Sequence, residues 1–260
     1  MFLSQLLVNP GSHPDKPRPG VEWIKQTYRV HQRIWMAFPD THRVKEDPFF
    51  LGTWASGTGN KPQRAESGFL FRIEPESPLR ILVQSVTQPN WEYAFQNAPH
   101  LLAAPPQVRE FAPRFKEGQV FRFRLVMQMV TRRTVPKSQV IPIGVKRRSE
   151  HPIPWSGTDS ADLGIAPGHP AGSAWRAKLE RAATSAGFDL SPFMNQLRIQ
   201  PVRNLFMKPE PGQPPRSFQA GLFDGQLACT DPERLRDSVV NGIGRGKAFG
   251  MGLLSLASLQ

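Results

Sequence analysis

The chain has 260 residues, enough for one large domain or two small ones. Its 33 lysines and arginines outnumber 21 acidic residues, and the net charge of +12 indicates a polyanionic partner, most simply a nucleic acid. The single cysteine, Cys229, excludes an internal disulfide and a zinc site built on cysteines. No apolar run reaches the ~18 residues of a membrane span, and no signal peptide is recognisable. We therefore expect a cytoplasmic protein with no membrane contact and no metal or other cofactor.

The first half of the chain has the pattern of a small α+β unit. Apolar residues at three- and four-residue steps predict a helix that Pro39 ends, and Phe121, Phe123 and Leu125 alternate with arginines as in a half-buried strand. The expected elements are strands over 2–8, 68–73, 79–86 and 118–129, a helix over 21–38, and a proline-broken helical segment within 91–111. This β-α-β-β-(α)-β order is ferredoxin-like, and we assign it to residues 1–130.

The second half repeats that order over residues 131–260. Asp231 and Pro232 form a helix start, and Asp224-Gly225 has the composition of a hairpin turn. The expected elements are strands over 140–145, 195–207 and 251–256, helices over 173–187 and 232–240, and a hairpin over 218–230. Residues 149–172 are rich in Pro, Gly and Ser and read as an inserted loop. The predicted fold class is thus α+β, with two tandem ferredoxin-like (RRM-like) domains.

Basic residues are concentrated around residues 132–148. No acidic residue lies between Glu117 and Glu150, an interval long enough to favour an element that follows a phosphate backbone over an ordinary solvated face. The candidate phosphate-contacting residues of this interval are Arg132, Arg133, Lys137, Lys146, Arg147 and Arg148.

A glycine-rich stretch near the C-terminus is a second candidate site. Glycines at 242, 244, 246, 250 and 252 leave one strip of backbone bare, and the cations Arg245 and Lys247 lie between them. Bare N–H donors beside cations suit a phosphodiester, with Gly244, Arg245, Gly246 and Lys247 as candidate contacts. The alternative is a flexible turn before the last strand, and spacing alone does not separate the two.

Tyr28 and His31 are the candidate catalytic residues. They lie three residues apart on the first predicted helix and therefore project from one side. A histidine exchanges a proton near pH 7, and a tyrosine can orient a hydrogen bond. The alternative is an ordinary core or surface histidine.

Several segments together resemble one protein family. The chain is similar to the CasE family, the endoribonucleases that process CRISPR RNA in type I-E Cascade. The segments that carry this resemblance, which extends along nearly the whole chain, are Phe2-Leu-Ser-Gln-Leu, Tyr28-Arg-Val-His31-Gln-Arg-Ile-Trp35, Phe69-Leu-Phe-Arg-Ile-Glu-Pro75, Leu82-Val-Gln-Ser85, Pro89-Asn-Trp91, Phe121-Arg-Phe-Arg-Leu125, Gly221-Leu-Phe-Asp-Gly-Gln-Leu227 and Gly242-Ile-Gly-Arg-Gly-Lys-Ala-Phe-Gly-Met-Gly-Leu-Leu-Ser-Leu256. Two features depart from the family: Arg124-Leu-Val-Met-Gln-Met129 replaces its usual Arg-Ala-Asn-Pro, and the 149–172 loop is longer.

The resemblance implies a function. It implies metal-independent cleavage of the CRISPR repeat at the 3′ base of its stem-loop, which leaves a 2′,3′-cyclic phosphate and a 5′-hydroxyl. It also implies that the protein retains the product hairpin and joins other Cascade subunits. His31 matches the catalytic histidine of the family and Tyr28 its tyrosine, while the basic interval matches its hairpin-binding element. Which residue acts as base or acid stays open, as does whether Arg245 or Lys247 faces the phosphate.

Two alternatives belong to other classes of protein. A non-catalytic RNA-hairpin-binding module would have the same fold and basic surface but would not cut. A DNA-binding architectural protein would bind the DNA form of the hairpin equally well.

Overall fold

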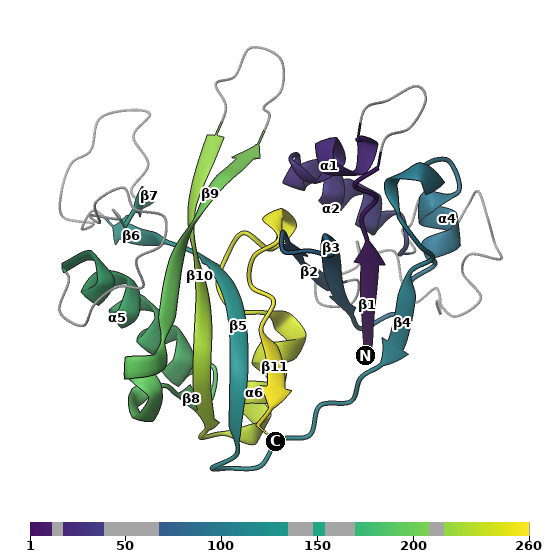
Figure 1. The fold of residues 1–260 in the computed structure, drawn as a ribbon. Helices are drawn as coiled ribbons and strands as arrows, with labels where there is room; N and C mark the ends of the chain where they lie inside the picture. Colours follow the sequence, from purple (N-terminus) through teal and green to yellow (C-terminus); the bar gives the residue numbers. More distant parts are fainter. Residues whose placement is uncertain (12–17, 39–67, 135–147, 154–169, 208–215, 260) are drawn as a thin grey trace, which may run out of the picture.

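Two antiparallel sheets, each with its own helices, lie side by side in the molecule (Figure 1). The computed structural model describes residues 1–11, 18–38, 68–134, 148–153, 170–207 and 216–259. Among the helices of these residues, none is both long and apolar enough to cross a bilayer.

The first sheet has four strands in the order β2-β3-β1-β4. The strands are β1 (Phe2–Leu7), β2 (Phe69–Glu74), β3 (Arg80–Ser85) and β4 (Gln107–Glu110). The helical segments of this unit are α1 (Pro19–Ile24), α2 (Thr27–Trp35), α4 (Trp91–Phe95) and the 3₁₀ helix η2 (Pro99–Leu101). Leu6, Phe71 and Val83 pack against Val30 and Ile34 of α2 in a core that the helices cover.

The second sheet has five strands. Four follow the order β11-β5-β10-β8, and β9 also pairs with β10. The strands are β5 (Val120–Gln128), β8 (Phe188–Asp189), β9 (Arg198–Met207), β10 (Arg216–Cys229) and β11 (Ser255–Ser258). The helical segments are α5 (Pro170–Ser185), α6 (Pro232–Asn241) and the 3₁₀ helices η3 (Ser191–Gln196) and η4 (Lys247–Phe249).

Both sheets have the arrangement of a ferredoxin-like domain. Numbering the main strands of each unit in chain order gives 2-3-1-4 for the first sheet, and β9-β10-β5-β11 gives the same order for the second. The fold is therefore α+β with two tandem ferredoxin-like domains, as the sequence predicts.

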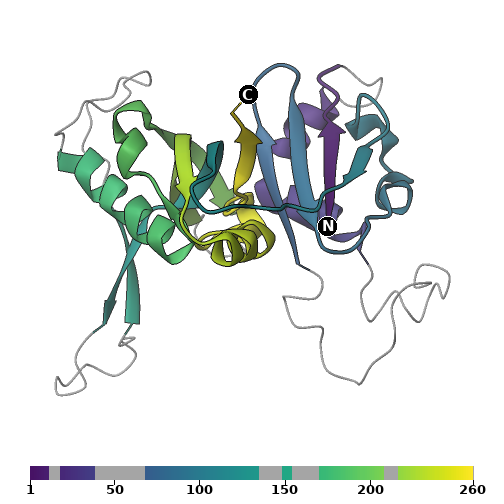
Figure 2. The same cartoon turned by 90° about the horizontal axis from the view of Figure 1, so that it is seen from below.

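The strand expected over 118–129 belongs to the second unit, so its expected place in the first is wrong. β5 pairs with β10 and β11 of the second sheet, whereas β4 completes the first sheet beside β1. All four side chains of β4 are exposed, so its sequence has no apolar alternation to reveal it. The expected boundary at residue 130 falls after the first strand of the second sheet. We propose a boundary within residues 111–119, the segment that crosses between the units (Figure 2).

The expected hairpin at Asp224-Gly225 is wrong, because β10 runs straight through it. Asp224 and Gly225 stay in register with Arg124 and Phe123 of β5. A Cβ atom on Gly225 would lie 3.3 Å from side-chain atoms of Leu197 and Phe123. This glycine therefore marks close packing inside a strand rather than a turn.

Other boundaries differ from the sequence-based expectation. The helix over 21–38 is two helices, because Gln26 leaves the helical region with φ −107° and ψ 78°. The ends of the expected loop over 149–172 belong to a strand and to α5, while the expected strand over 140–145 lies outside the described residues. The N-cap at Asp231 is confirmed, since its carboxylate accepts hydrogen bonds from the N–H groups of Glu233 and Arg234.

Candidate functional site

Tyr28 and His31 lie together on α2, as their spacing predicts. Their ring centroids are 6.0 Å apart and the rings are close to parallel. Tyr28 is 39% exposed, and His31 is half-buried. The pair therefore forms part of an accessible surface.

Two aromatic rings of β2 stack against the imidazole of His31. The imidazole lies 5.1 Å from the ring of Phe69 and 6.2 Å from that of Phe71, nearly parallel to both. Trp35 meets the imidazole edge-on at 5.6 Å and also lies 6.1 Å from the ring of Phe69. These contacts hold the orientation of the imidazole, as a group that must transfer a proton at one place requires.

The glycine-rich stretch folds into a closed loop beside this helix. Ile243 N–H donates to the Gly252 carbonyl at 2.8 Å, and Gly252 N–H donates to the Val126 carbonyl of β5 at 2.7 Å. Gly244 and Gly246 have φ of 78° and 79°, values that glycine adopts without strain. The positive φ values suit both a phosphate-binding loop and a structural turn. The N–H groups of Ile243 and Gly252, however, already donate hydrogen bonds within the protein.

The loop brings Phe249 against Tyr28. Their ring centroids lie 6.0 Å apart, although the two residues come from opposite ends of the chain. Phe249 is a site residue that the sequence does not single out, since an aromatic residue between glycines also suits a core position. The one signal for it in the sequence is its place between the glycines of this stretch.

The two cations of the loop differ in position. Arg245 is exposed, and Lys247 is half-buried with its ammonium group donating to the carbonyl of Asn241 at the end of α6. Lys247 thus closes the loop in this structure through one of the three N–H donors of its ammonium group.

The two ends of the predicted basic interval form a separate antiparallel strand pair, called the basic hairpin below. Arg132 and Arg133 lie in β6 (Val130–Thr134) and Arg148 lies in β7 (Arg148–Pro152), while Lys137, Lys146 and Arg147 fall outside the described residues. Arg132 is opposite Glu150 in the strand register. This hairpin projects from the second unit on the side away from α2, so the structure does not bring it to Tyr28 and His31 (Figures 1 and 2).

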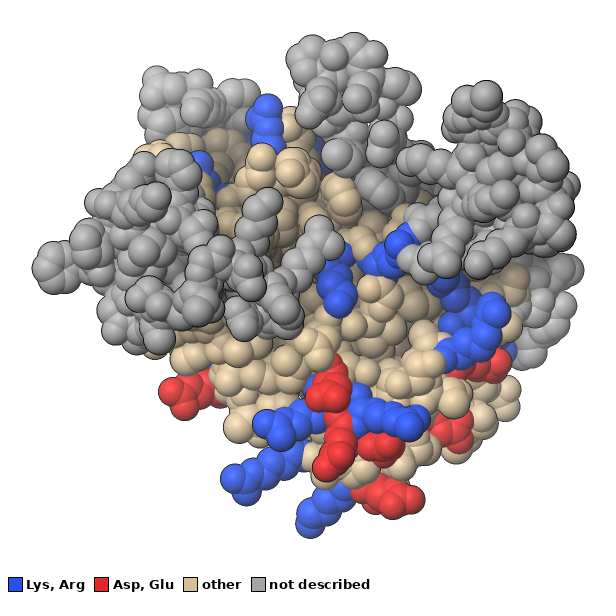
Figure 3. Space-filling model, turned by 180° about the vertical axis from the view of Figure 1, so that it is seen from behind, with Lys and Arg blue, Asp and Glu red and all other residues tan. Residues whose placement is uncertain are grey.

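The described charged side chains are unevenly distributed on the face that Figure 3 shows. Seen from behind, the acidic side chains lie in the lower half among basic ones, and the described charged residues of the upper half are basic (Figure 3).

A buried ion-pair network joins the two units next to the glycine loop. Arg72 of β2 is 3% exposed and donates to Glu74 at 2.7 Å, to the carbonyls of Arg124 and Leu253 at 3.1 Å, and to Ser255 Oγ at 2.9 Å. Burial lowers the pKa of the Arg72 guanidinium, against the opposing attraction of Glu74.

Arg124 extends this network to β10. Its guanidinium pairs with Glu74 at 2.7 Å, with Glu76 at 3.0 Å and with Asp224 at 2.7 Å. Hydrogen bonds to Asp224, the largest influence, raise the pKa of Arg124 despite partial burial. The sequence does not predict the residues that fix the glycine loop to β2, because no local pattern links Arg72 to Leu253.

No metal site is evident in the described ranges. Among these residues, no three His, Cys, Asp or Glu side chains gather into a group that could hold an ion. His31 contacts the aromatic rings of Trp35, Phe69 and Phe71. The arrangement can therefore offer a proton-exchanging imidazole, a phenol and nearby cations to a bound ligand.

The chain is similar to known CRISPR-associated proteins along nearly its full length. The chain is 26% identical over 266 aligned positions to the CRISPR-associated endoribonuclease Cse3 of Thermus thermophilus, with 99% of this chain and 100% of that protein covered. The structure of Thermus thermophilus Cse3 bound to an RNA representing a pre-cleavage complex is 26% identical, with a TM-score of 0.61 and 98% of each chain covered. Cas6e of Escherichia coli K-12 shares the fold at 21% identity, with a TM-score of 0.53 and all of both chains covered.

A family model gives the same result. The model described as CRISPR associated protein matches residues 1–258, almost the entire chain. The chain belongs to this family of CRISPR associated proteins.

Proposed function

We propose that this protein is a metal-independent endoribonuclease that cleaves CRISPR repeat RNA at the 3′ base of its stem-loop. The observation that carries the proposal is the accessible pair of Tyr28 and His31, with Phe249 of the glycine loop against it. The similarity to an endoribonuclease over the full length supports the same activity.

The proposed reaction uses a nucleophile that RNA itself carries. The 2′-hydroxyl loses its proton and forms a bond to the adjacent phosphorus, while the bond from phosphorus to the 5′-oxygen breaks. The leaving 5′-oxygen takes a proton, so the products end in a 2′,3′-cyclic phosphate and a 5′-hydroxyl. No metal or covalent enzyme intermediate is needed if a side chain moves these protons.

His31 is the proposed proton-transfer group of this reaction. Its imidazole acts as the base toward the 2′-hydroxyl or as the acid toward the 5′-oxygen, and Tyr28 orients the reacting oxygen. The phosphorane gains negative charge, which Arg245, Lys247 and the N–H groups around Gly244 and Gly246 would stabilise.

Recognition of the hairpin would come mainly from its shape. The major groove of A-form RNA is deep and narrow, so proteins contact its backbone instead of reading its bases. We assign the backbone contacts of the stem to the basic hairpin, with Arg132, Arg133, Lys137, Lys146, Arg147 and Arg148. The distance between this hairpin and α2 suits a substrate that extends across the second unit.

The proposal includes retention of the product hairpin and assembly with other Cascade subunits, in the cytoplasm. Incubation of the protein with a repeat RNA tests the activity directly. One cut at the base of the stem, lost when the nucleotide at the cut is 2′-deoxy, is the expected result. Tight binding without cleavage would instead favour the non-catalytic RNA-binding module.

A further inference from the structure

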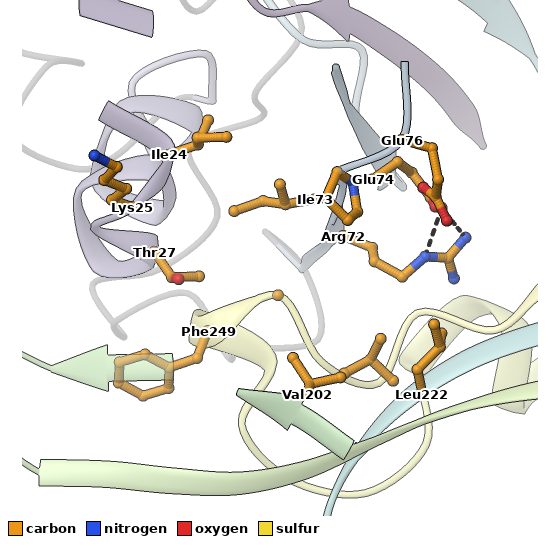
Figure 4. A pocket seen from close by; sticks show the side chains of 13 residues that line it. Ile24, Lys25, Thr27, Arg72, Ile73, Glu74, Glu76, Val202, Leu222 and Phe249 are labelled. Atoms are coloured by element: carbon orange, nitrogen blue, oxygen red, sulfur yellow. Dashed lines mark hydrogen bonds and ion pairs between the residues drawn. The ribbon is translucent and has the colours of Figure 1, made fainter. Parts of the chain in front are cut away.

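A cavity of about 640 Å³ lies between the two units next to the proposed reaction site (Figure 4). Most of its wall is apolar, with Ile73 from β2, Val202 and Leu222 from β9 and β10, and Phe249 from the glycine loop. Its size is within the range of roughly 300–1,000 Å³ that is usual for small-molecule sites. The cavity is thus large enough for a nucleotide-sized group.

Phe249 connects the cavity to Tyr28. Its ring lines the cavity and also lies 6.0 Å from the ring of Tyr28. Thr27, which immediately precedes Tyr28 on α2, lines the cavity as well. A group bound there would therefore be a close neighbour of whatever reacts at Tyr28 and His31.

The charges of the cavity wall distinguish a base from a phosphate. The lining carries two cations, Lys25 and Arg72, and two carboxylates, Glu74 and Glu76. Arg72 and Glu74 neutralise each other across 2.6 Å. On a chain with a net charge of +12, this nearly neutral and largely apolar space is unsuited to a phosphodiester and well suited to an uncharged aromatic base.

Polar groups in the cavity could bind the edge of a base. Glu76 is 52% exposed and accepts from Arg124 through Oε1 at 3.0 Å. A carboxylate has four lone-pair sites, so this oxygen pair can also accept from an exocyclic amino group. The hydroxyl of Thr27 can donate or accept at the opposite side of the cavity (Figure 4).

We propose that this cavity binds one unpaired nucleobase of the RNA strand that flanks the scissile phosphate. The inference rests on the proposed function and deepens it, because it adds a base-binding subsite beside the reaction site. Proteins read single-stranded RNA by stacking unstacked bases on aromatic side chains, and Phe249 supplies the ring here. A base held in this position would fix the strand on one side of the phosphate that is cut.

The test combines an abasic scan of the RNA with a variant that fills the cavity. The substrates are repeat hairpins with unpaired nucleotides on both sides of the cut, each with one flanking base removed. With the wild-type protein, one flanking position should lose about 5- to 150-fold in kcat/KM, the factor expected for about 1–3 kcal/mol of base stacking. Leu222→Trp should lose a similar factor on the intact substrate and lose nothing further on that abasic substrate.

Matched controls separate this effect from a change in folding. Val108→Trp places the same ring on the exposed side of β4, outside the cavity, and should behave as the wild type on every substrate. If Leu222→Trp melts at a lower temperature than the wild type, Val202→Phe fills the same cavity from the neighbouring strand and repeats the measurement. The inference would be overturned if the losses in kcat/KM from Leu222→Trp and from the missing base multiplied when combined. A scan in which no flanking position is sensitive would overturn it as well.

The outcome also separates this inference from the proposed function. Cleavage of the repeat RNA with multiplicative effects would leave the endoribonuclease in place and remove only the base subsite. Absence of any cleavage would contradict the proposed function. The same scan is then read as Kd on a 2′-deoxy substrate, where non-additive losses support the subsite and additive ones reject it. If Leu222→Trp affected assembly with a protein partner and not RNA handling, the cavity would be a protein-docking site and the inference wrong.

Discussion

Tyr28 of α2 lies 6.0 Å, between ring centroids, from Phe249 of the glycine loop, so the helix and the loop meet at one surface. Neither segment predicts the other from its own sequence. The first domain supplies Tyr28 and His31, and the second supplies the loop. The proposed site therefore depends on the relative placement of the two domains.

Strand β2 links the two parts of this site through its opposite faces. Phe71 stacks below His31 at 6.2 Å, while the neighbouring Arg72 donates to the carbonyl of Leu253 just after the glycine loop. Alternation of side chains along a strand puts these two residues on opposite faces. One strand thus fixes the imidazole on one face and the end of the loop on the other.

We expect Gly244→Val to impair RNA cleavage more than it destabilises the fold. A valine resists the φ of 78°, at a cost of about 1–3 kcal/mol, and its Cβ would lie 3.3 Å from Met127 Cγ. Its methyl groups would also occupy an exposed position where a phosphate would approach. Gly118→Val is the control for the strained φ alone, because Gly118 has a φ of 75° in a turn remote from the site and no atoms near its Cβ position. Thermal melting and hairpin affinity are measured on both variants. Similar melting losses with normal RNA binding in both would make the glycine loop a purely structural turn.

Gly246→Val should lose stability as well as RNA binding. A Cβ atom there would lie 2.8 Å from Met251 Sδ, a distance so short that the buried Met251 side chain or the loop must shift. Its melting temperature should therefore fall further than that of Gly244→Val. Equal melting temperatures for the two variants would show that the loop adapts around Met251 without cost.

The Glu74 carboxylate should stabilise the protein in a pH-dependent way. Its burial favours the neutral acid, but ion pairs with Arg72 and Arg124 outweigh this and hold the pKa of Glu74 below its usual value. A lowered pKa in the folded state gives stability that is fully present above the unfolded pKa of about 4.3 and is lost as the pH falls through the folded value. Glu74→Gln leaves Arg72 buried without its countercharge, and such losses cost about 3–5 kcal/mol.

Chemical denaturation of both proteins from pH 3 to pH 7 measures this effect. The difference in unfolding free energy between wild type and Glu74→Gln should be constant near neutral pH and shrink in acid. Glu76→Gln removes the exposed carboxylate that pairs with Arg124, and it should change the free energy of unfolding little. A difference that grows in acid would contradict the assigned role of Glu74.

Neutralising the basic hairpin should weaken RNA binding and reduce its salt dependence. The variant changes Arg132, Arg133, Arg147 and Arg148 to Gln, and the slope of log K against log salt should fall by roughly one for each phosphate that the protein no longer neutralises. A control with the same change in net charge neutralises four exposed arginines on other elements: Arg114, Arg181, Arg234 and Arg236. If both variants had the wild-type slope, the hairpin would be an ordinary solvated surface.

Much of the fold could be predicted where one face of an element is buried. The alternation in β5 and the N-cap at Asp231 are local patterns with direct physical causes, and both are confirmed. Prediction failed where burial gives no pattern, as in the exposed β4, or where a residue type has two uses, as with Gly225 in β10. Because β4 was not recognised, the sequence-based prediction assigned β5 to the first unit in its place.

The candidate site was predictable in its parts and not in its assembly. The spacing of Tyr28 and His31 was enough to place them side by side, and the glycine pattern indicated positive φ values that the structure contains. The contact with Phe249 and the buried Arg72 depend on long-range packing between the domains, which no local pattern reports. The roles of all these residues in RNA cleavage stay predictions.

The central claim is that His31 drives a cut that uses the 2′-hydroxyl of the RNA, without a metal. The most direct test is mass spectrometry of the upstream product after incubation of repeat RNA with chelator and wild-type, His31→Ala, Tyr28→Phe or His100→Ala protein. We expect a 2′,3′-cyclic phosphate from the wild type and from His100→Ala. The cleavage rate of His31→Ala should be about 10²–10⁴-fold lower, with its hairpin affinity within a few-fold of the wild type. Tyr28→Phe should lose less rate than His31→Ala. A 3′-hydroxyl product, inhibition by chelator, or near wild-type cleavage by His31→Ala would contradict the account.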